Sequence, residues 1–282
     1  MSEHTKLYQE IIKKSLIEDH FNNDITSDCC IKDKNINFKL TAKEDIILCA
    51  ANIAQDTFDI IKKDKKFQDC SFTISKIKKD GDQIKKGQII CMGSGSAKLI
   101  LAGERVLLNI MQHLSGIATK TNKYITKLNN AKIKISDTRK TIPLLRNLQK
   151  YAVKIGGGFN HRKNLSQAIL IKDNHIAICG DITTTLKQFK NKIIEIECDN
   201  IDQVKQAIPF NPQIIMLDNM NIDNIDKCTK LIRSNCPKTK IEISGGIVID
   251  NIEQYSNLDI DYISIGDLTH SVKACDISLE IC

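Results

Sequence analysis

Six short apolar segments recur through the second half of the chain, and this repeat constrains the fold more than any other feature. Amphipathic stretches at 200–208 and 221–234 lie between some of them. Alternating strands and helices predict parallel strands joined by helical crossovers. We expect such units to close into a barrel, with an open doubly wound sheet as the alternative. The predicted strands are 132–137, 168–173, 193–198, 213–218, 240–245 and 262–267.

The first part of the chain has a different pattern and contains no glycine before Gly81. The spacing of apolar residues predicts a helix at about 4–18, a strand at 38–42 and a charged helix ending near 62–66. Alternating residues over 72–93, around Gly81 and Asp82, predict antiparallel strands. A long helix should follow, because Leu99, Leu107, Ile110, Met111 and Leu114 recur at helical spacing.

Composition excludes several classes of protein. The longest apolar run, residues 46–54, is far shorter than the roughly 18 apolar residues of a membrane span, and the N-terminus lacks the apolar core of a signal peptide. The eleven cysteines are scattered without a C-x-x-C pair, which argues against metal clusters and predicts free thiols in the reducing cytoplasm.

The net charge of +7 is carried mostly by lysine, with 36 lysines against five arginines. A nucleic-acid-binding protein is the alternative that this charge raises. Against it, the lysines are spread along the chain, there is no basic tail, and aromatic residues make up only 5% of the sequence. We therefore expect neither a nucleic acid nor a membrane as partner.

Functional side chains gather where the predicted strands end, and the carboxyl ends of barrel strands form the active-site face. The cationic residues between 136 and 175 would be costly together without anions to pair with them, so we expect a substrate with several negative charges. Arg146 and the Gly156–Gly158 turn have ordinary structural explanations. The cationic residues are Arg139, Lys140, His161, Arg162 and Lys172, and the other strand-end residues are Asp137, Asp173, Glu197, Asp218, Ser244 and Gly266.

Acidic residues stand opposite these cations. Glu195 and Glu197 are two positions apart on one strand and so face the same side, and Asp218 ends the next strand. Such carboxylates suit Mg²⁺ with substrate phosphates, or a positive transition state. An internal ion pair with Lys172 or Lys140 is the alternative, and it fits Glu195 better than Glu197 or Asp218.

Glycine-rich loops end the last two predicted strands, at 243–247 and 264–271. Loops at this place in a barrel commonly bind phosphate through backbone N–H groups. The earlier GSGSAK segment at 93–98 is better explained as a strand-to-helix turn. The combination predicts a phosphorylated, diphosphate-bearing substrate that reacts with a small anion.

Eight segments, in order, make the chain resemble the quinolinate phosphoribosyltransferases, also called nicotinate-nucleotide pyrophosphorylases (carboxylating). The resemblance is strong over about 100–278 and looser before that. The segments are GERVLLNIMQHLSGIAT, DTRKTIPLLR, KYAVKIGGGFNHR, LIKDNHI, IEIECDN, IMLDNM, EISGGI and YISIGDLTHS.

The resemblance implies a pentosyltransferase that joins quinolinate to phosphoribosyl diphosphate. Its products are nicotinate mononucleotide for NAD synthesis, CO₂ and diphosphate. The resemblance also implies that the reaction requires Mg²⁺ and uses no organic cofactor. It implies catalytic roles for Lys140, Lys172, Glu197 and Asp218, and Mg²⁺ binding by Glu197 and Asp218. The implied substrate-binding residues are Arg105, Thr138, Arg139, Lys140, His161, Arg162, Lys172, Ser244, Gly245, Gly246, Gly266 and His270.

The resemblance also implies an N-terminal α/β sandwich domain, residues 1–103 with 272–282, and an incomplete, open α/β barrel at 104–271. Arg105 would reach the site of a neighbouring subunit in a homodimer or a hexamer. A transferase of the same fold that acts on another aromatic ring, like the homologues associated with molybdate transport, is the alternative.

Three positions depart from the family pattern. Leu144 stands where a glycine is usual after the DTRKT segment, and Asp267 replaces a small residue beside the predicted phosphate loop. The early glycines of the first domain are replaced around Asp45–Ala50.

Overall fold

The structure of the protein, a computed structural model, describes residues 3–76, 78–189 and 193–282. The chain forms two compact units. Unit 1 comprises Met1–Lys120, Asn147–Gly156 and Val272–Cys282, and unit 2 comprises Thr121–Arg146 and Gly157–Ser271. The long helix predicted to follow residue 93 is confirmed as α4 (Ala97–Leu128). The boundary between the two units at Lys120 and Thr121 falls within this helix.

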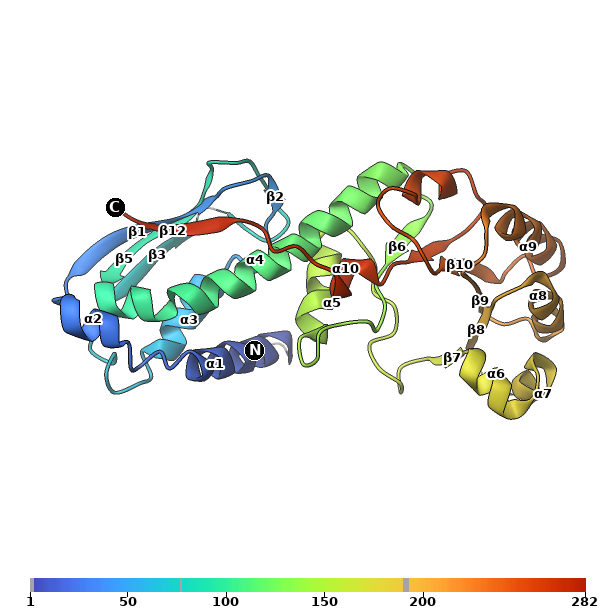
Figure 1. The fold of residues 1–282 in the computed structure, drawn as a ribbon, viewed down its shortest axis with the longest axis horizontal. Helices are drawn as coiled ribbons and strands as arrows, with labels where there is room; N and C mark the ends of the chain where they lie inside the picture. The colour runs from blue at the N-terminus through green and yellow to red at the C-terminus, as the bar shows by residue number, and fades with distance from the viewer. Residues whose placement is uncertain (1–2, 77, 190–192) are drawn as a thin grey trace. The chain divides into compact units, whose positions relative to one another are not determined.

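Unit 1 contains an antiparallel sheet with strand order β12-β1-β5-β3 (Figure 1). Helix α3 packs on it through Phe58, whose ring centroid lies 5.9 Å from that of Phe38 on β1 and 5.4 Å from that of Phe72 on β3. This arrangement confirms the predicted α/β sandwich. The elements of unit 1 are α1 (Glu3–Glu18), α2 (Ile25–Cys30), β1 (Asn35–Ala42), β2 (Ile46–Ile47), α3 (Ile53–Ile61), β3 (Phe72–Lys76), β4 (Gln83–Ile84), β5 (Ile89–Ser96), α5 (Arg146–Ile155) and β12 (Ile277–Ile281). The first residue of α5, Arg146, is assigned to unit 2.

The antiparallel strands predicted over 72–93 are confirmed for β3 and β5, which pair with each other. The segment directly after the Gly81–Asp82 turn behaves differently, because β4 pairs with β2 and not with β3. Residue 77 lies outside the described residues.

Unit 2 is built on a six-stranded sheet with the order β6-β11-β10-β9-β8-β7 (Figure 1). All its pairings are parallel, and the six predicted strands are all present. The strands are β6 (Lys134–Ser136), β7 (Ile169–Ile171), β8 (Ile194–Cys198), β9 (Ile214–Asp218), β10 (Lys240–Ser244) and β11 (Tyr262–Ser264). The helices are α6 (Asp173–Cys179), α7 (Ile182–Lys187), α8 (Ile201–Ala207), η1 (Ile208–Phe210), α9 (Ile222–Asn235), η2 (Ile252–Tyr255) and α10 (Asp267–His270).

The strand order identifies an open barrel. Strands β7 to β11 follow one another as they do along the chain, without the reversal that marks a doubly wound sheet. The first strand, β6, pairs with the last, β11, as in a closed barrel. Within the described residues β6 and β7 are the two edges, so the barrel is incomplete, as predicted.

Strand β8 shows how this sheet positions polar groups. All five of its residues are buried, because both faces of a barrel sheet are covered. Ile194, Ile196 and Cys198 share one face, and Glu195 and Glu197 share the other. The parallel strands end at one edge of the sheet, so their last residues come together there.

Among the described helices, none is both long and apolar enough to cross a membrane.

Candidate active site

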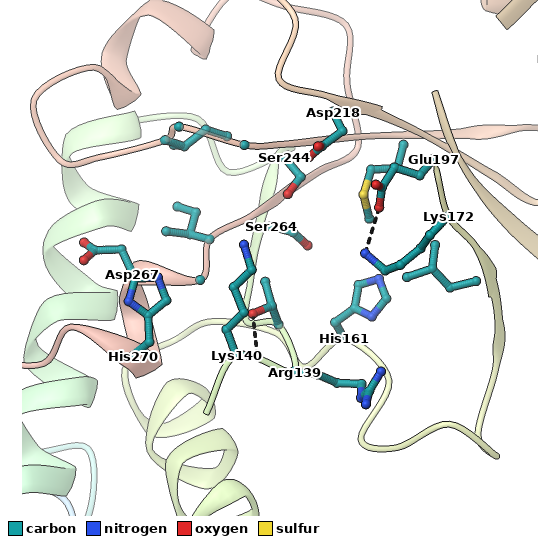
Figure 2. Close-up of a pocket in the computed structure, with 18 of the residues that line it drawn as sticks. Arg139, Lys140, His161, Lys172, Glu197, Asp218, Ser244, Ser264, Asp267 and His270 are labelled. Carbon is teal, nitrogen blue, oxygen red and sulfur yellow. Dashed lines mark hydrogen bonds and ion pairs between the residues drawn. The ribbon is translucent and has the colours of Figure 1, made fainter. Parts of the chain in front are cut away.

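A cavity of about 740 Å³ opens at the carboxyl ends of the strands of unit 2. Side chains reach it from the last residues of separate strands and from the loops that follow them (Figure 2). Arg105, an exposed residue of α4 in unit 1, is the one catalytic or substrate-binding residue implied by the family resemblance that is not among its lining residues. The predicted residues that line it are Thr138, Arg139, Lys140, His161, Arg162, Lys172, Glu197, Asp218, Ser244, Gly245, Gly246, Gly266 and His270.

Arg139 and Arg162 make one side of the cavity strongly cationic. The Nε atoms of both are buried and have no hydrogen-bond partner among the described residues. Burial, together with repulsion from Arg139, lowers the pKa of the Arg162 guanidinium below its ordinary value. Two guanidinium groups held in this way are stabilised by an anion that accepts from both.

The loop that carries Arg162 is anchored to the end of β6 by Asp137, which is fully buried. Its carboxylate accepts hydrogen bonds from the Asn160 side chain at 2.6 Å and from the His161 backbone N–H at 3.0 Å. Asp137 is not among the lining residues. This predicted strand-end residue therefore supports the site from beneath.

The alternative of an internal ion pair with lysine holds for Glu197 and not for Glu195, where it was expected to fit better. Lys172 Nζ instead lies 2.8 Å from Glu197 Oε2, an interaction drawn in Figure 2, and Glu195 Oε1 lies 3.0 Å from His161 Nε2. The register explains the exchange, because Leu170 on β7 is paired with Glu195 on β8. Lys172, two residues further along, therefore reaches the level of Glu197.

A cluster of three carboxylates lies at the ends of β8 and β9. Oxygen atoms of Glu197, Asp199 and Asp218 all lie within 4.8 Å of one another. Burial raises the pKa of Glu197, and the neighbouring Lys172 ammonium opposes that rise. Asp199 was missed by the sequence analysis, although it follows the strand directly in the IECDN segment.

The third side of the cavity combines glycines with two basic side chains. Gly245 and Gly246 follow β10 with φ values of +89° and +61°. A Cβ atom at Gly266 would lie 3.0 Å from Lys140 Cδ and 3.1 Å from His270 Cδ2, so both basic residues pack against this glycine. The Thr269 hydroxyl donates to the Lys140 carbonyl at 2.7 Å and holds the loop after β6 in place.

Comparisons with known proteins identify the family. Residues 117–280 match the quinolinate phosphoribosyl transferase C-terminal domain, and residues 24–115 match the N-terminal domain of the same family. The chain belongs to the quinolinate phosphoribosyl transferase family.

Named relatives are similar over nearly their whole length. The chain is 38% identical to the probable nicotinate-nucleotide pyrophosphorylase [carboxylating] of Bacillus subtilis, over 97% of this chain and 93% of that protein. It is 39% identical to the protein of the same name from Methanocaldococcus jannaschii, over 96% of each. The crystal structure of the nicotinate-nucleotide pyrophosphorylase from Ehrlichia chaffeensis superposes with a TM-score of 0.88 at 37% identity, covering 100% of this chain and 99% of that one.

Two departures of this family member from the expected pattern have visible backbone consequences. Leu144 has a φ of +67° and is 79% exposed, and Ala50 has a φ of +71° and is buried. Glycine adopts such angles without strain, so a glycine would suit the backbone at both places.

The third departure, Asp267, has a partner that explains its charge. The hydroxyl of the buried Tyr124 on α4 donates to Asp267 Oδ2 at 2.7 Å, within unit 2. Asp267 begins α10 and does not end a strand, so the predicted strand 262–267 stops early, at Ser264.

Two segments that the sequence analysis considered structural have structural roles. Arg146 donates to the Thr141 hydroxyl at 3.0 Å and to the Lys163 carbonyl at 3.1 Å, so it braces two loops of unit 2. The GSGSAK segment connects β5 to α4, as expected of a strand-to-helix turn.

Proposed function

We propose that the protein transfers the phosphoribosyl group of phosphoribosyl diphosphate to quinolinate and releases CO₂, diphosphate and nicotinate mononucleotide. The observation that carries this proposal is that Arg139 and Arg162 line the same cavity, and that the buried Nε atom of each has no hydrogen-bond partner among the described residues. A buried N–H group without an acceptor costs about 1–3 kcal/mol, and a dicarboxylate would supply acceptors to both. The names of the relatives favour this reaction over transfer to another aromatic ring.

Quinolinate carries adjacent carboxylates on a pyridine ring. In our proposal Arg139 and Arg162 bind them through charge-assisted hydrogen bonds, and Lys172 adds a third cation at the same wall. Thr138 and His161 line this region and complete the walls around the ring.

The second substrate fits the opposite side. Lys140 and His270, packed on Gly266, would bind the 5′-phosphate together with Ser244, Gly245 and Gly246. As the bond to diphosphate breaks, positive charge develops on the ribose. The carboxylates of Glu197 and Asp218, which lie at the ends of β8 and β9, would stabilise that charge. Lys140 and Lys172 would counter the charge of the leaving diphosphate and of the substrate carboxylates.

The cluster of carboxylates formed by Glu197, Asp199 and Asp218 fits a magnesium ion, because it offers only hard oxygen donors. We propose that Glu197 and Asp218, with Asp199, hold Mg²⁺ together with substrate. The ion would neutralise diphosphate charge, and no organic cofactor is needed.

We further propose a homodimer or a larger assembly in the cytoplasm, in which Arg105 completes the site of a neighbouring subunit. The exposed position of Arg105 in the GERVLLNIM segment supports the first part, and the eleven free cysteines support the second. Mixing inactive Arg105→Ala with inactive Lys172→Ala protein should restore part of the activity. Mixtures that remain inactive would contradict the sharing of Arg105.

Competition between ring acids tests the proposed substrate. Quinolinate should bind more tightly than nicotinate, which lacks one carboxylate, by the roughly 1.5–3 kcal/mol of a charged hydrogen bond. Titration calorimetry should therefore show dissociation constants that differ by about ten- to a hundredfold or more. Arg162→Ala should reduce that ratio. Equal affinity for both acids would contradict the proposal.

A further inference from the structure

Two buried carboxyl groups lie beneath the cationic wall of the cavity. Glu242 on β10 is 2% exposed and Glu195 on β8 is 5% exposed, and neither is among the lining residues. Burying carboxyl groups is costly unless they have partners. Both of them lie near the same atom, His161 Nε2, which is 3.0 Å from Glu195 Oε1 and 3.6 Å from Glu242 Oε1.

Glu242 is itself held in place. The Ser264 hydroxyl on the neighbouring strand β11 donates to Glu242 Oε1 at 2.5 Å. Burial, and the negative charge of Glu195 close by, raise the pKa of Glu242 to about 7. A group kept in such a costly position, directly under the site, needs an explanation that packing does not provide.

The hydrogen bonds of His161 determine its tautomer. The backbone N–H of Arg162 donates to His161 Nδ1 at 2.8 Å, and a backbone N–H can only donate. Nδ1 therefore carries no proton, and the ring proton lies on Nε2, where it points to the carboxyl pair. Both ring nitrogens bond within the protein, so His161 is not a cationic substrate ligand in this arrangement.

The same interactions fix the residue that follows. His161 is held by its backbone N–H, which donates to Asp137, and by its ring Nε2, which donates to Glu195. The same Nε2–H faces Glu242 Oε1 at 3.6 Å, a charge–dipole contact and not a hydrogen bond. His161 Nδ1 in turn holds the backbone of Arg162. The Arg162 side chain is braced at one end only, by the 2.9 Å hydrogen bond from Nη1 to the Ala168 carbonyl, while its Nε stays unpartnered among the described residues.

We propose that Glu242 is a positioning residue of the cationic wall: with Glu195 it fixes the His161 ring, and through that ring it fixes Arg162 for a substrate carboxylate. This inference rests on the proposed function, since quinolinate is the anion that Arg162 would receive. Glu242 acts through His161 and does not touch the substrate.

Glu242→Gln in the full-length protein tests the proposal. The amide keeps the volume and the acceptor for Ser264 but weakens the hold on His161 Nε2. We expect the KM for quinolinate to rise about tenfold, a coupling of ordinary size for buried residues in contact, with kcat and the KM for phosphoribosyl diphosphate nearly unchanged. The matched control is Asp261→Asn, another carboxyl-to-amide change, at the opposite end of the sheet, where Asp261 pairs with Arg233 and Lys240. It should leave every KM unchanged.

A double-mutant cycle with His161→Asn separates positioning from a general loss of structure. The asparagine side chain introduced by that change retains an acceptor for the Arg162 N–H but does not extend to Glu242. In that background Glu242→Gln should change the KM for quinolinate by less than about twofold. If Glu242→Gln does not fold, Glu242→Asp completes the same cycle.

Three results would overturn the inference or its basis in distinguishable ways. A wild-type KM for quinolinate in Glu242→Gln, or effects that multiply independently in the double variant, would refute the positioning role while leaving the activity established. Absence of quinolinate turnover by the wild-type protein would refute the proposed function instead.

Discussion

The glycines that follow β10 offer a matched pair of substitutions, Gly245→Ala and Gly246→Ala. A Cβ atom on Gly245 would lie 2.1 Å from Asn219 Oδ1 and 2.7 Å from the Asn219 backbone nitrogen. The side-chain amide can rotate away, but the backbone nitrogen cannot. A Cβ atom on Gly246 would meet nothing within 4 Å.

These geometries give different costs. Both glycines have positive φ, at +89° and +61°, so either alanine is destabilising by about 1–2 kcal/mol because of its left-handed backbone. Gly245→Ala adds a further cost of about 1–3 kcal/mol for overpacking. Asn219 donates to Asp218 Oδ2 at 2.6 Å and to the Ser244 carbonyl at 3.0 Å, so its displacement also disturbs a proposed catalytic carboxylate.

Thermal unfolding and quinolinate turnover, measured on both variants, check the reasoning. The extra cost should lower the melting temperature of Gly245→Ala by about 2–10 °C relative to that of Gly246→Ala. Its kcat should fall as well, because Asp218 moves. Equal melting temperatures for the two variants would refute the argument that Asn219 is packed against Gly245.

Further substitutions test other parts of the structure. Burial beside Glu195 raises the pKa of Glu242 to about 7, whereas in the unfolded chain it is about 4.3. Between these two pH values the folded protein holds a proton that the unfolded chain has lost, so the free energy of unfolding falls as the pH rises. Glu242→Gln should therefore show a flatter dependence of unfolding free energy on pH between about 4.3 and 7. An unchanged slope would contradict this. Leu144→Gly should stabilise by up to about 1 kcal/mol by relieving the φ of +67°, measured by thermal unfolding, whereas a loss of stability would show that the turn is unstrained. Tyr124→Phe should lower the free energy of unfolding by about 1 kcal/mol, because Asp267 loses a hydrogen-bond donor. An unchanged melting temperature would show that this hydrogen bond does not stabilise the fold.

The strands of unit 2 were predictable because each is a short, isoleucine-rich run, and local pattern decides such elements. The pairing of β4 was not, since its two residues find their partner in β2 and not across the adjacent turn. Residue types and strand ends also placed most of the cavity lining correctly. Arg105, implied by the family resemblance, and the strand-end residue Asp137 are not among the lining residues of this cavity.

Interactions that depend on register and burial were beyond prediction from the sequence. The partner of Lys172 follows from the alignment of β7 with β8, which places Glu197 and not Glu195 opposite it. His161 looked like one more cation in the sequence. Only the folded chain brings Glu195 and Glu242 to its Nε2, and no local pattern encodes that meeting.

The most direct test of the central claim is product stoichiometry with the purified full-length protein. Quinolinate, phosphoribosyl diphosphate and Mg²⁺ should yield nicotinate mononucleotide, CO₂ and diphosphate in equal amounts, and Arg139→Ala or Arg162→Ala should raise the KM for quinolinate most. Nicotinate in place of quinolinate should give no product. Turnover of nicotinate, or folded protein that forms no nicotinate mononucleotide from quinolinate, would contradict the account.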